Sequence, residues 1–240
     1  MIGRRSRPLR RIDGQGDDAG LSLVELLVAV MLMGIVLTMV ASLFISTTKS
    51  TAQSGEVHES TGNASNMANA LGGVIRFATT NPKTGSTVPD PAVVVARADR
   101  LALIAAVGVS ATAEPSGRPP KPTLVEFSSA SNRLTERRWT PTASGATWVF
   151  AGGSDPTTAV PAMTRGLGGR LTNAAVFTYF DATGAPLDPG TGALTATQRA
   201  NVAEIGIRLV VVPPSNPAGA QSVVIERRIP LANLGLRGPT

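Results

Sequence analysis

Hydrophobic and polar positions change their pattern twice along the chain, and the first region is almost uniformly apolar. It runs from Leu21 to Ile45 and carries a single charge, at Glu25. An α-helix of this length spans roughly 37 Å, which is enough to cross a bilayer core of about 30 Å. A cleavable secretory signal is the main alternative, but its apolar region usually has about 7–15 residues. The pattern therefore predicts a membrane-spanning helix.

A helical pattern continues beyond the apolar region. No proline occurs between Leu21 and Asn81. Apolar residues recur at intervals of three, four or seven positions, at Val57, Ala64, Met67, Leu71, Val74 and Ala78. These intervals place them on one face of a helix. Interspersed glycines each cost about 1 kcal/mol relative to alanine, so packing against another element must hold this helix. We expect one helix over residues 21–79, ended by Asn81-Pro82.

From residue 92 onward the pattern predicts short strands separated by turns. The clearest alternation places Ile205, Ile207 and Leu209 on one face of a strand. Candidate strands are 93–97, 100–107, 123–127, 133–139, 147–150, 174–180, 204–212 and 222–229. No helix-length periodic run separates them, which favours antiparallel pairing. The predicted fold class is α+β: a long N-terminal helix, membrane-spanning in its first half, packed against an antiparallel β-sheet domain.

Composition excludes several kinds of chemistry. The chain has no cysteine and one histidine, His58. Disulfides, thiolate metal sites, cysteine nucleophiles and histidine-rich metal centres are therefore excluded. The sequence also lacks a Gly-x-Ser-x-Gly elbow and a phosphate loop ending in Gly-Lys-Ser/Thr. We predict no catalytic residue, no cofactor and no metal, and interpret His58 as a solvated helix residue. The protein is not expected to be an enzyme.

An acidic loop is one candidate ligand site in the β-rich region. Asp181 and Asp188 flank a loop rich in glycine and proline and could contribute to a calcium site. Their spacing does not match an EF-hand loop. Aspartate and glycine are also the residues that tight turns favour, and we prefer this interpretation.

A basic patch is the second candidate. Alternation along a strand would put Arg133 and Arg137 on one face and Arg138 on the other. Together with Arg227 and Arg228 they could contact DNA. Single-stranded nucleic acid needs aromatic partners as well, and Trp139 is the only obvious one. A solvated sheet face is the favoured interpretation.

Charges around the apolar region predict how it is oriented and raise a question about Glu25. The formal net charge is +6, and arginines precede the apolar region at Arg4, Arg5, Arg7, Arg10 and Arg11. They should remain in the cytoplasm, with the chain from about Thr47 outside. A carboxylate costs about 2.5–3.5 kcal/mol at the centre of a membrane helix, and less near its start, where the helix dipole favours an anion. Glu25 either caps the first turn or requires a positive partner from another chain.

The residues from Gly20 to Ala29, GLSLVELLVA, resemble the cleavage and methylation signature of type IV prepilins and pseudopilins. The resemblance implies that a prepilin peptidase cuts between Gly20 and Leu21 and that the new amino group of Leu21 is methylated. Glu25 would then neutralise the N-terminus of a neighbouring subunit, because such a pair costs less than two isolated buried charges. Gly34 would allow close helix packing. The chain departs from the family in having leucine rather than phenylalanine at position 21, and Asp17-Asp18-Ala19 before Gly20.

The resemblance also implies a function and a domain organisation. The order of the predicted strands is similar to that of larger minor pilins and J-type pseudopilins. Such a protein is a structural subunit of a type IV pilus or related filament that serves adhesion, motility, DNA uptake or secretion. We expect a leader (1–20), a transmembrane and assembly segment (21–45), an extracellular amphipathic segment (46–80) and a β-rich head (81–240).

The same resemblance implies the partners and the location. Expected partners are prepilin peptidase, other subunits bound through the N-terminal helix, membrane lipid and an assembly platform protein. The chain would pass the membrane once, with its leader in the cytoplasm and its head outside, and then join a cell-surface filament. The alternative is a single-pass, membrane-anchored extracellular binding protein without a filament role, which would need neither Gly20 nor Glu25.

Overall fold

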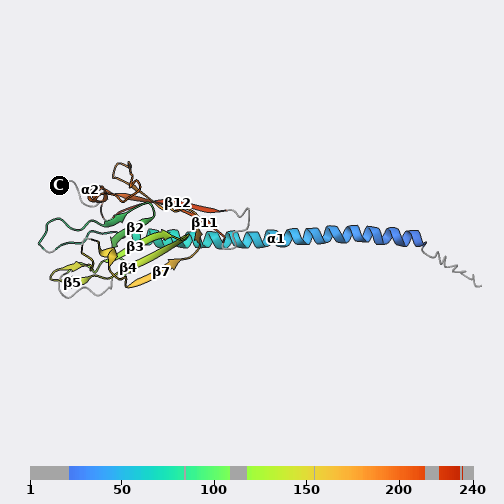
Figure 1. Cartoon of the computed structure of the whole chain (residues 1–240), viewed down its shortest axis with the longest axis horizontal. Coiled ribbons are helices and arrows are strands. Elements are labelled where there is room, and N and C mark those ends of the chain that lie inside the picture. The colour runs from blue at the N-terminus through green and yellow to red at the C-terminus, as the bar shows by residue number, and fades with distance from the viewer. Residues whose placement is uncertain are drawn as a thin grey trace, which may run out of the picture. The chain divides into compact units, whose positions relative to one another are not determined.

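A computed structural model describes residues 22–83, 85–108, 118–153, 155–213, 222–232 and 234. The chain divides into two compact units, one ending at Thr51 and the other beginning at Ala52. The long helix α1 (Leu23–Ile75) belongs to both. Figure 1 shows α1 and the strands of the second unit. The predicted single long helix is confirmed.

The C-terminal end of α1 is set by strand pairing rather than by Asn81-Pro82. Phe77 O accepts a hydrogen bond from Ala106 N, and Thr79 N donates to Ile104 O, both at 2.8 Å. Ala78 forms a bridge with Ala105. These bonds require an extended backbone, so the helix ends at Ile75, four residues before the predicted end.

The strands form three antiparallel sheets rather than one. We call β1-β2-β3-β4-β7 the first sheet and β10-β9-β11-β12, with β8 on β11, the second sheet. The first contains β1 (Val93–Ala96), β2 (Arg100–Ala105), β3 (Thr123–Ala130), β4 (Arg133–Trp139) and β7 (Met163–Leu167). The second contains β8 (Arg170–Leu171), β9 (Phe177–Phe180), β10 (Pro186–Leu187), β11 (Glu204–Val212) and β12 (Val223–Pro230). A hairpin of β5 (Thr142–Ser144) and β6 (Thr147–Val149) stands apart, with short helices η1 (Pro156–Thr158) and α2 (Ala196–Ala200).

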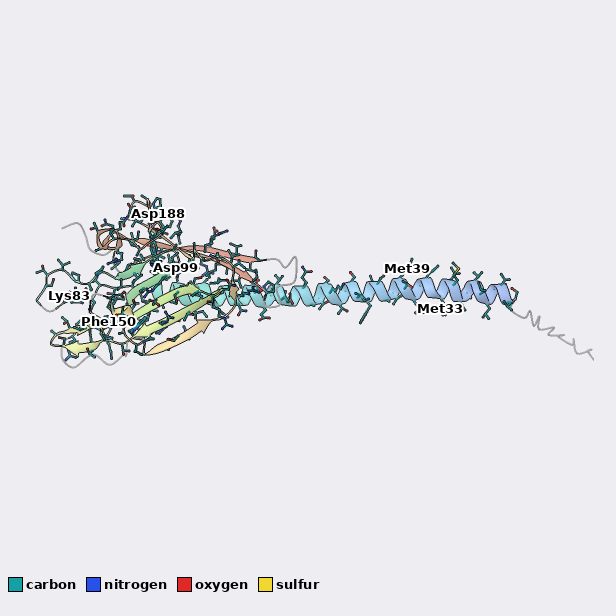
Figure 2. The ribbon with its side chains drawn as sticks, in the orientation of Figure 1. Met33, Met39, Lys83, Asp99, Phe150 and Asp188 are labelled. Carbon is teal, nitrogen blue, oxygen red and sulfur yellow. The ribbon has the colours of Figure 1, made fainter. Side chains whose placement is uncertain are left out.

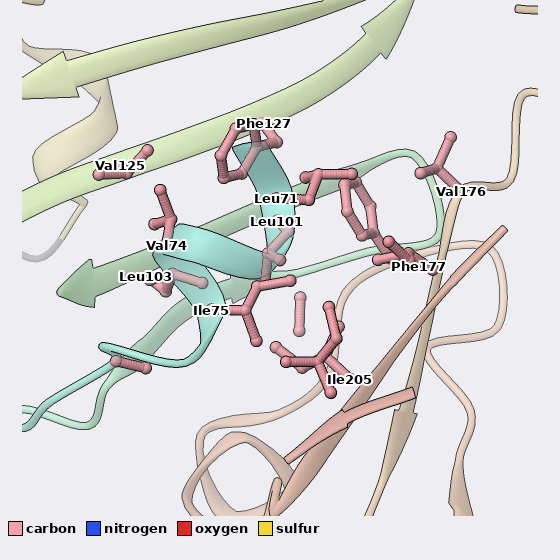
Figure 3. Close-up of a cluster of buried hydrophobic side chains, with 14 of the residues drawn as sticks. Leu71, Val74, Ile75, Leu101, Leu103, Val125, Phe127, Val176, Phe177 and Ile205 are labelled. Atoms are coloured by element: carbon pink, nitrogen blue, oxygen red, sulfur yellow. The ribbon is translucent and has the colours of Figure 1, made fainter. Parts of the chain in front are cut away.

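One face of α1 packs against both five-stranded sheets. Leu71, Val74 and Ile75 are buried with Phe127 of the first sheet and Ile205 of the second in one cluster (Figure 3). Each large apolar side chain buried in this way contributes about 1.5–3 kcal/mol. That gain offsets the poor helical propensity of the glycine-containing segment, as the apolar periodicity of this face predicts.

A second apolar cluster lies on the other face of the first sheet. Ile104, Leu124, Trp139 and Phe150 are buried there, with Val94 and Ala159 packed against them. Leu124 and Trp139 are directly paired between β3 and β4. Phe150 and Ala159, which follow β4 in the chain, cover part of this face.

Candidate functional site

The apolar part of α1 presents its side chains outward on all sides. Leu26, Leu37 and Phe44 are each more than half exposed. Met33 and Met39 extend from the helix with no other element against them (Figure 2). Among the described residues, α1 is the helix that is long and apolar enough to cross a membrane. Because a helix that is apolar all round needs an apolar environment, this segment is suited to lipid or to neighbouring helices.

The first turn of α1 shows how Glu25 is accommodated within its own chain. Ser22 precedes the helix, and its Oγ accepts a hydrogen bond from Glu25 N at 3.1 Å. Ser22 N donates in return to Glu25 Oε2 at 3.0 Å. This reciprocal pair is a capping box, which satisfies two of the backbone N–H groups left free at a helix start.

Glu25 therefore caps the first turn of its own helix, as one of the two interpretations predicts. The capped carboxylate can still bind a positive partner from another chain, which is the other interpretation. The carboxylate lies at the positive end of the helix dipole, which stabilises it. The hydrogen bond from Ser22 N engages Oε2 of the carboxylate. A carboxylate has a second oxygen that can accept further bonds, so a cation from another chain can bind without breaking the cap.

The predicted cleavage and methylation residues, Gly20 and Leu21, lie outside the described residues. Gly34 lies within α1, and an added Cβ would meet no atom within 4 Å there. Its carbonyl oxygen accepts a hydrogen bond from Thr38 Oγ1 at 2.8 Å. Within the described residues nothing requires glycine at this position, so its role in helix packing between subunits stays a prediction.

A family model described as the prokaryotic N-terminal methylation motif matches residues 17–41. The match includes Gly20, Leu21, the Ser22–Glu25 cap and Gly34. The N-terminal segment therefore carries a prepilin-type methylation motif. This motif accounts for the exposed apolar helix and for its acidic first turn.

Comparison with other proteins gives one further likeness. No curated protein sequence matches this pilin-like chain significantly. A solved structure, the GspK-GspI-GspJ complex of the type 2 secretion system of enterotoxigenic Escherichia coli, contains a similar chain. The two are 12% identical with a TM-score of 0.41, over 75% of this chain and 99% of the other.

The arginines of the predicted basic patch do not gather on one surface. Arg137 and Arg138 lie on opposite faces of β4, as predicted, because neighbouring residues of a strand alternate. Arg137 Nη1 donates to Glu126 Oε1 at 2.8 Å, and Arg138 Nε donates to Glu136 Oε1.

Two buried carboxylates organise these arginines, and the sequence pattern did not reveal them. Glu126 and Glu136 are almost fully buried. Glu126 also accepts from Arg100 Nε at 2.6 Å, and Glu136 accepts from Arg165 Nε at 2.7 Å. Buried charges require such partners. The arginines therefore stabilise the first sheet.

The other arginines of the set are also engaged. Arg227 Nη1 donates to Asn69 Oδ1 of α1 at 3.2 Å, and the Arg228 guanidinium lies 3.9 Å from the centre of the Phe180 ring. Among the described residues, Arg133 and Arg227 are the arginines of this set without an ion-pair partner, and Arg227 is held instead by its hydrogen bond to Asn69. The geometry favours the solvated sheet face over a DNA-binding patch.

The acidic loop forms turns. Asp181 Oδ1 accepts hydrogen bonds from Thr183 Oγ1 at 2.6 Å, Thr183 N at 2.8 Å and Ala185 N at 2.9 Å. The Thr183 hydroxyl bond is the main cause that holds the pKa of the Asp181 carboxyl below its usual range. Asp188 Oδ1 accepts from Gly190 N at 2.8 Å. Within the described ranges no group of acidic or histidine side chains is arranged to hold a metal.

Ser22 is the functional residue that sequence reasoning missed. The signal was present, because serine followed three residues later by glutamate before an apolar run is the sequence signature of a capping box. The sequence pattern singled out Glu25 as a charge in an apolar run, but it did not single out Ser22, the hydrogen-bonding partner of Glu25.

Proposed function

We propose that this chain is a minor pilin or pseudopilin, a structural subunit that assembles through the apolar part of α1 into a type IV pilus or related filament. The observation that carries the proposal is the capped Glu25 at the start of a helix that is apolar all round. A lone carboxylate is costly in a bilayer, and a membrane anchor alone does not need one.

The proposed processing follows from the same motif. Prepilin peptidase cuts between Gly20 and Leu21, and the amine of Leu21 is methylated. The released amino group carries one positive charge in apolar surroundings, where the carboxylate of a neighbouring Glu25 can match it. Gly34 lets adjacent helices approach closely. Assembly then replaces lipid around α1 with the same segment of other subunits.

The domain organisation proposed is a cytoplasmic leader (1–20), a membrane and assembly segment (21–45), an extracellular amphipathic segment (46–80) and an extracellular head (81–240). A head of this size is difficult to repeat every few ångströms along a fibre. This favours a low-abundance subunit over a main shaft subunit. The proposed partners are prepilin peptidase, other subunits, membrane lipid and an assembly platform protein.

Site-specific cross-linking tests the filament role directly. The chain has no native cysteine, so Leu37→Cys carries a unique thiol for a benzophenone photo-cross-linker. Val160→Cys, which is highly exposed in the head, is the matched control. We expect Leu37→Cys to give adducts with other chains that carry the same N-terminal motif, identified by mass spectrometry, and Val160→Cys to give few.

A second substitution shows whether the adducts depend on the register, which is the alignment of neighbouring helices that the pairing of Glu25 with an N-terminus would set. Glu25→Val in the Leu37→Cys chain should leave membrane insertion intact and abolish the adducts. Adducts that persist at wild-type yield would remove the register role of Glu25. A chain that is found in the membrane without adducts at either position would be a solitary anchored protein instead of a filament subunit.

A further inference from the structure

A hollow of about 460 Å³ opens beside the second apolar cluster. Its walls come from β1, β2, the β5–β6 hairpin, η1, α2 and the chain between α1 and β1. The apolar part of the lining includes Val94, Ile104, Val149, Phe150 and Pro156. This volume is within the range of ligand pockets, and it corresponds to about 15 water molecules at 30 Å³ each.

The hollow leaves apolar surface uncovered. Val149 is 48% exposed although it lies next to the buried Phe150. An apolar group placed there would cover Val149 and extend the second apolar cluster.

One wall carries a positive charge that has no anionic partner. Arg199 lines the hollow, and its Nη1 donates to Leu194 O at 3.0 Å, which holds the guanidinium in place. Its Nε is buried without an acceptor, and in the described part of the chain no carboxylate pairs with it. A buried N–H of this kind is costly unless it is hydrogen-bonded.

The other charged groups at the hollow, Lys83 and Asp90, neutralise each other. Lys83 Nζ lies 2.6 Å from Asp90 Oδ1, with both side chains partly exposed, and Ser144 adds a hydroxyl. The lining therefore has a net charge of +1 from Arg199. The complementary ligand carries one negative charge next to an apolar body.

We propose that this hollow binds the C-terminal residue of a peptide chain. The apolar side chain of that residue contacts Val149 and Phe150, and its α-carboxylate binds the guanidinium of Arg199. An inorganic anion would leave the apolar wall exposed. A fatty acid would offer no group to Ser144 or to the Lys83–Asp90 pair, whereas a peptide amide supplies both a donor and an acceptor. This binding site is independent of the filament role.

The test uses the full-length chain in lipid nanodiscs and tryptophan fluorescence, because Trp139 belongs to the second apolar cluster and Trp148 precedes Val149. The probe is acetyl-Ala-Phe with a free carboxylate. Its C-terminal amide and hexanoate are the comparison ligands. We expect saturable binding of the acid, and binding of the other two ligands that is weaker by about tenfold or more. The C-terminal amide lacks the charge that binds Arg199, and hexanoate lacks the peptide amide that bonds to Ser144 and the Lys83–Asp90 pair.

Matched variants locate the site. Arg199→Gln should weaken binding of the acid by about tenfold, whereas Arg133→Gln removes the same charge elsewhere on the head and should not. Val149→Trp fills the hollow from a half-exposed position and should abolish binding while the thermal unfolding midpoint is retained. Equal binding of acid and amide, hexanoate binding as tightly as the peptide, unchanged binding by Arg199→Gln, or absence of saturable binding would overturn the proposal.

Discussion

Glu25 has two roles in this account, and three substitutions separate them. Ser22→Ala removes the hydroxyl that accepts from Glu25 N but keeps the charge. Glu25→Gln removes the charge but keeps an oxygen for Ser22 N, because glutamine also serves at this position of a capping box. Glu25→Val removes both. The series therefore distinguishes a helix cap from a charge that pairs subunits.

The two roles differ in magnitude. Loss of the N-cap side chain costs about 1 kcal/mol, which corresponds to roughly a fivefold change in an equilibrium. An unmatched terminal amine within an apolar helix bundle costs about 3 kcal/mol if it behaves like other charges on insertion scales, or more than a hundredfold. Ser22→Ala should lower assembly modestly, and Glu25→Gln and Glu25→Val should both nearly abolish it.

The assay measures the fraction of each chain in sheared surface filaments relative to the membrane fraction, and alkaline extraction verifies membrane insertion of every variant. The expected order is wild type, then Ser22→Ala, with Glu25→Gln and Glu25→Val far below and similar to each other. The reasoning fails if Glu25→Gln assembles as well as Ser22→Ala while Glu25→Val does not. Assembly would then require the cap and not the charge.

Three further predictions concern the head. Tyr179 is the chain's only tyrosine, and burial raises the pKa of its hydroxyl. The stability that the protonated Tyr179 contributes is therefore full below about pH 10 and declines at higher pH. In an alkaline titration, tyrosinate absorbance should appear only together with loss of the near-ultraviolet circular dichroism of the folded head. Gly206→Ala should lower the free energy of unfolding by about 1–3 kcal/mol, measured by chemical denaturation, because its Cβ would overlap Thr178 Oγ1. Glu136→Gln should lower the free energy of unfolding by about 3 kcal/mol, because it breaks buried ion pairs. Glu226 forms an exposed ion pair, so Glu226→Gln should change the free energy of unfolding by less than about 1 kcal/mol. Equal effects of the two substitutions would contradict the role of burial.

Local pattern predicted the helix and the strands that bury one face. The bounds of β4 and β11 agree with the predicted ranges 133–139 and 204–212. In β11 the apolar Ile205, Ile207 and Leu209 alternate with polar residues or glycine. β9 begins at Phe177 instead of 174, since Val176 N and Phe177 N both donate to Ala98 O. β7 was not predicted, because it is an exposed edge strand without alternating burial.

Contacts between distant segments could not be inferred from the sequence in the same way. Glu126 and Glu136 occur in strands that look like ordinary exposed alternation, and their burial depends on arginines at four other positions. The division of the strands into two five-stranded sheets depends on which strands pair across long loops. The Arg199 hollow likewise arises from six separate elements, and none of them has a distinctive motif.

The mass of the mature chain shows whether prepilin peptidase processes this protein. Protein purified from membranes and from filaments of cells that contain prepilin peptidase should begin at Leu21 and carry one methyl group on its amine, whereas cells without the peptidase should retain the arginine-containing leader. A chain from peptidase-containing cells that still begins at Met1, or at any residue other than Leu21, would contradict the account.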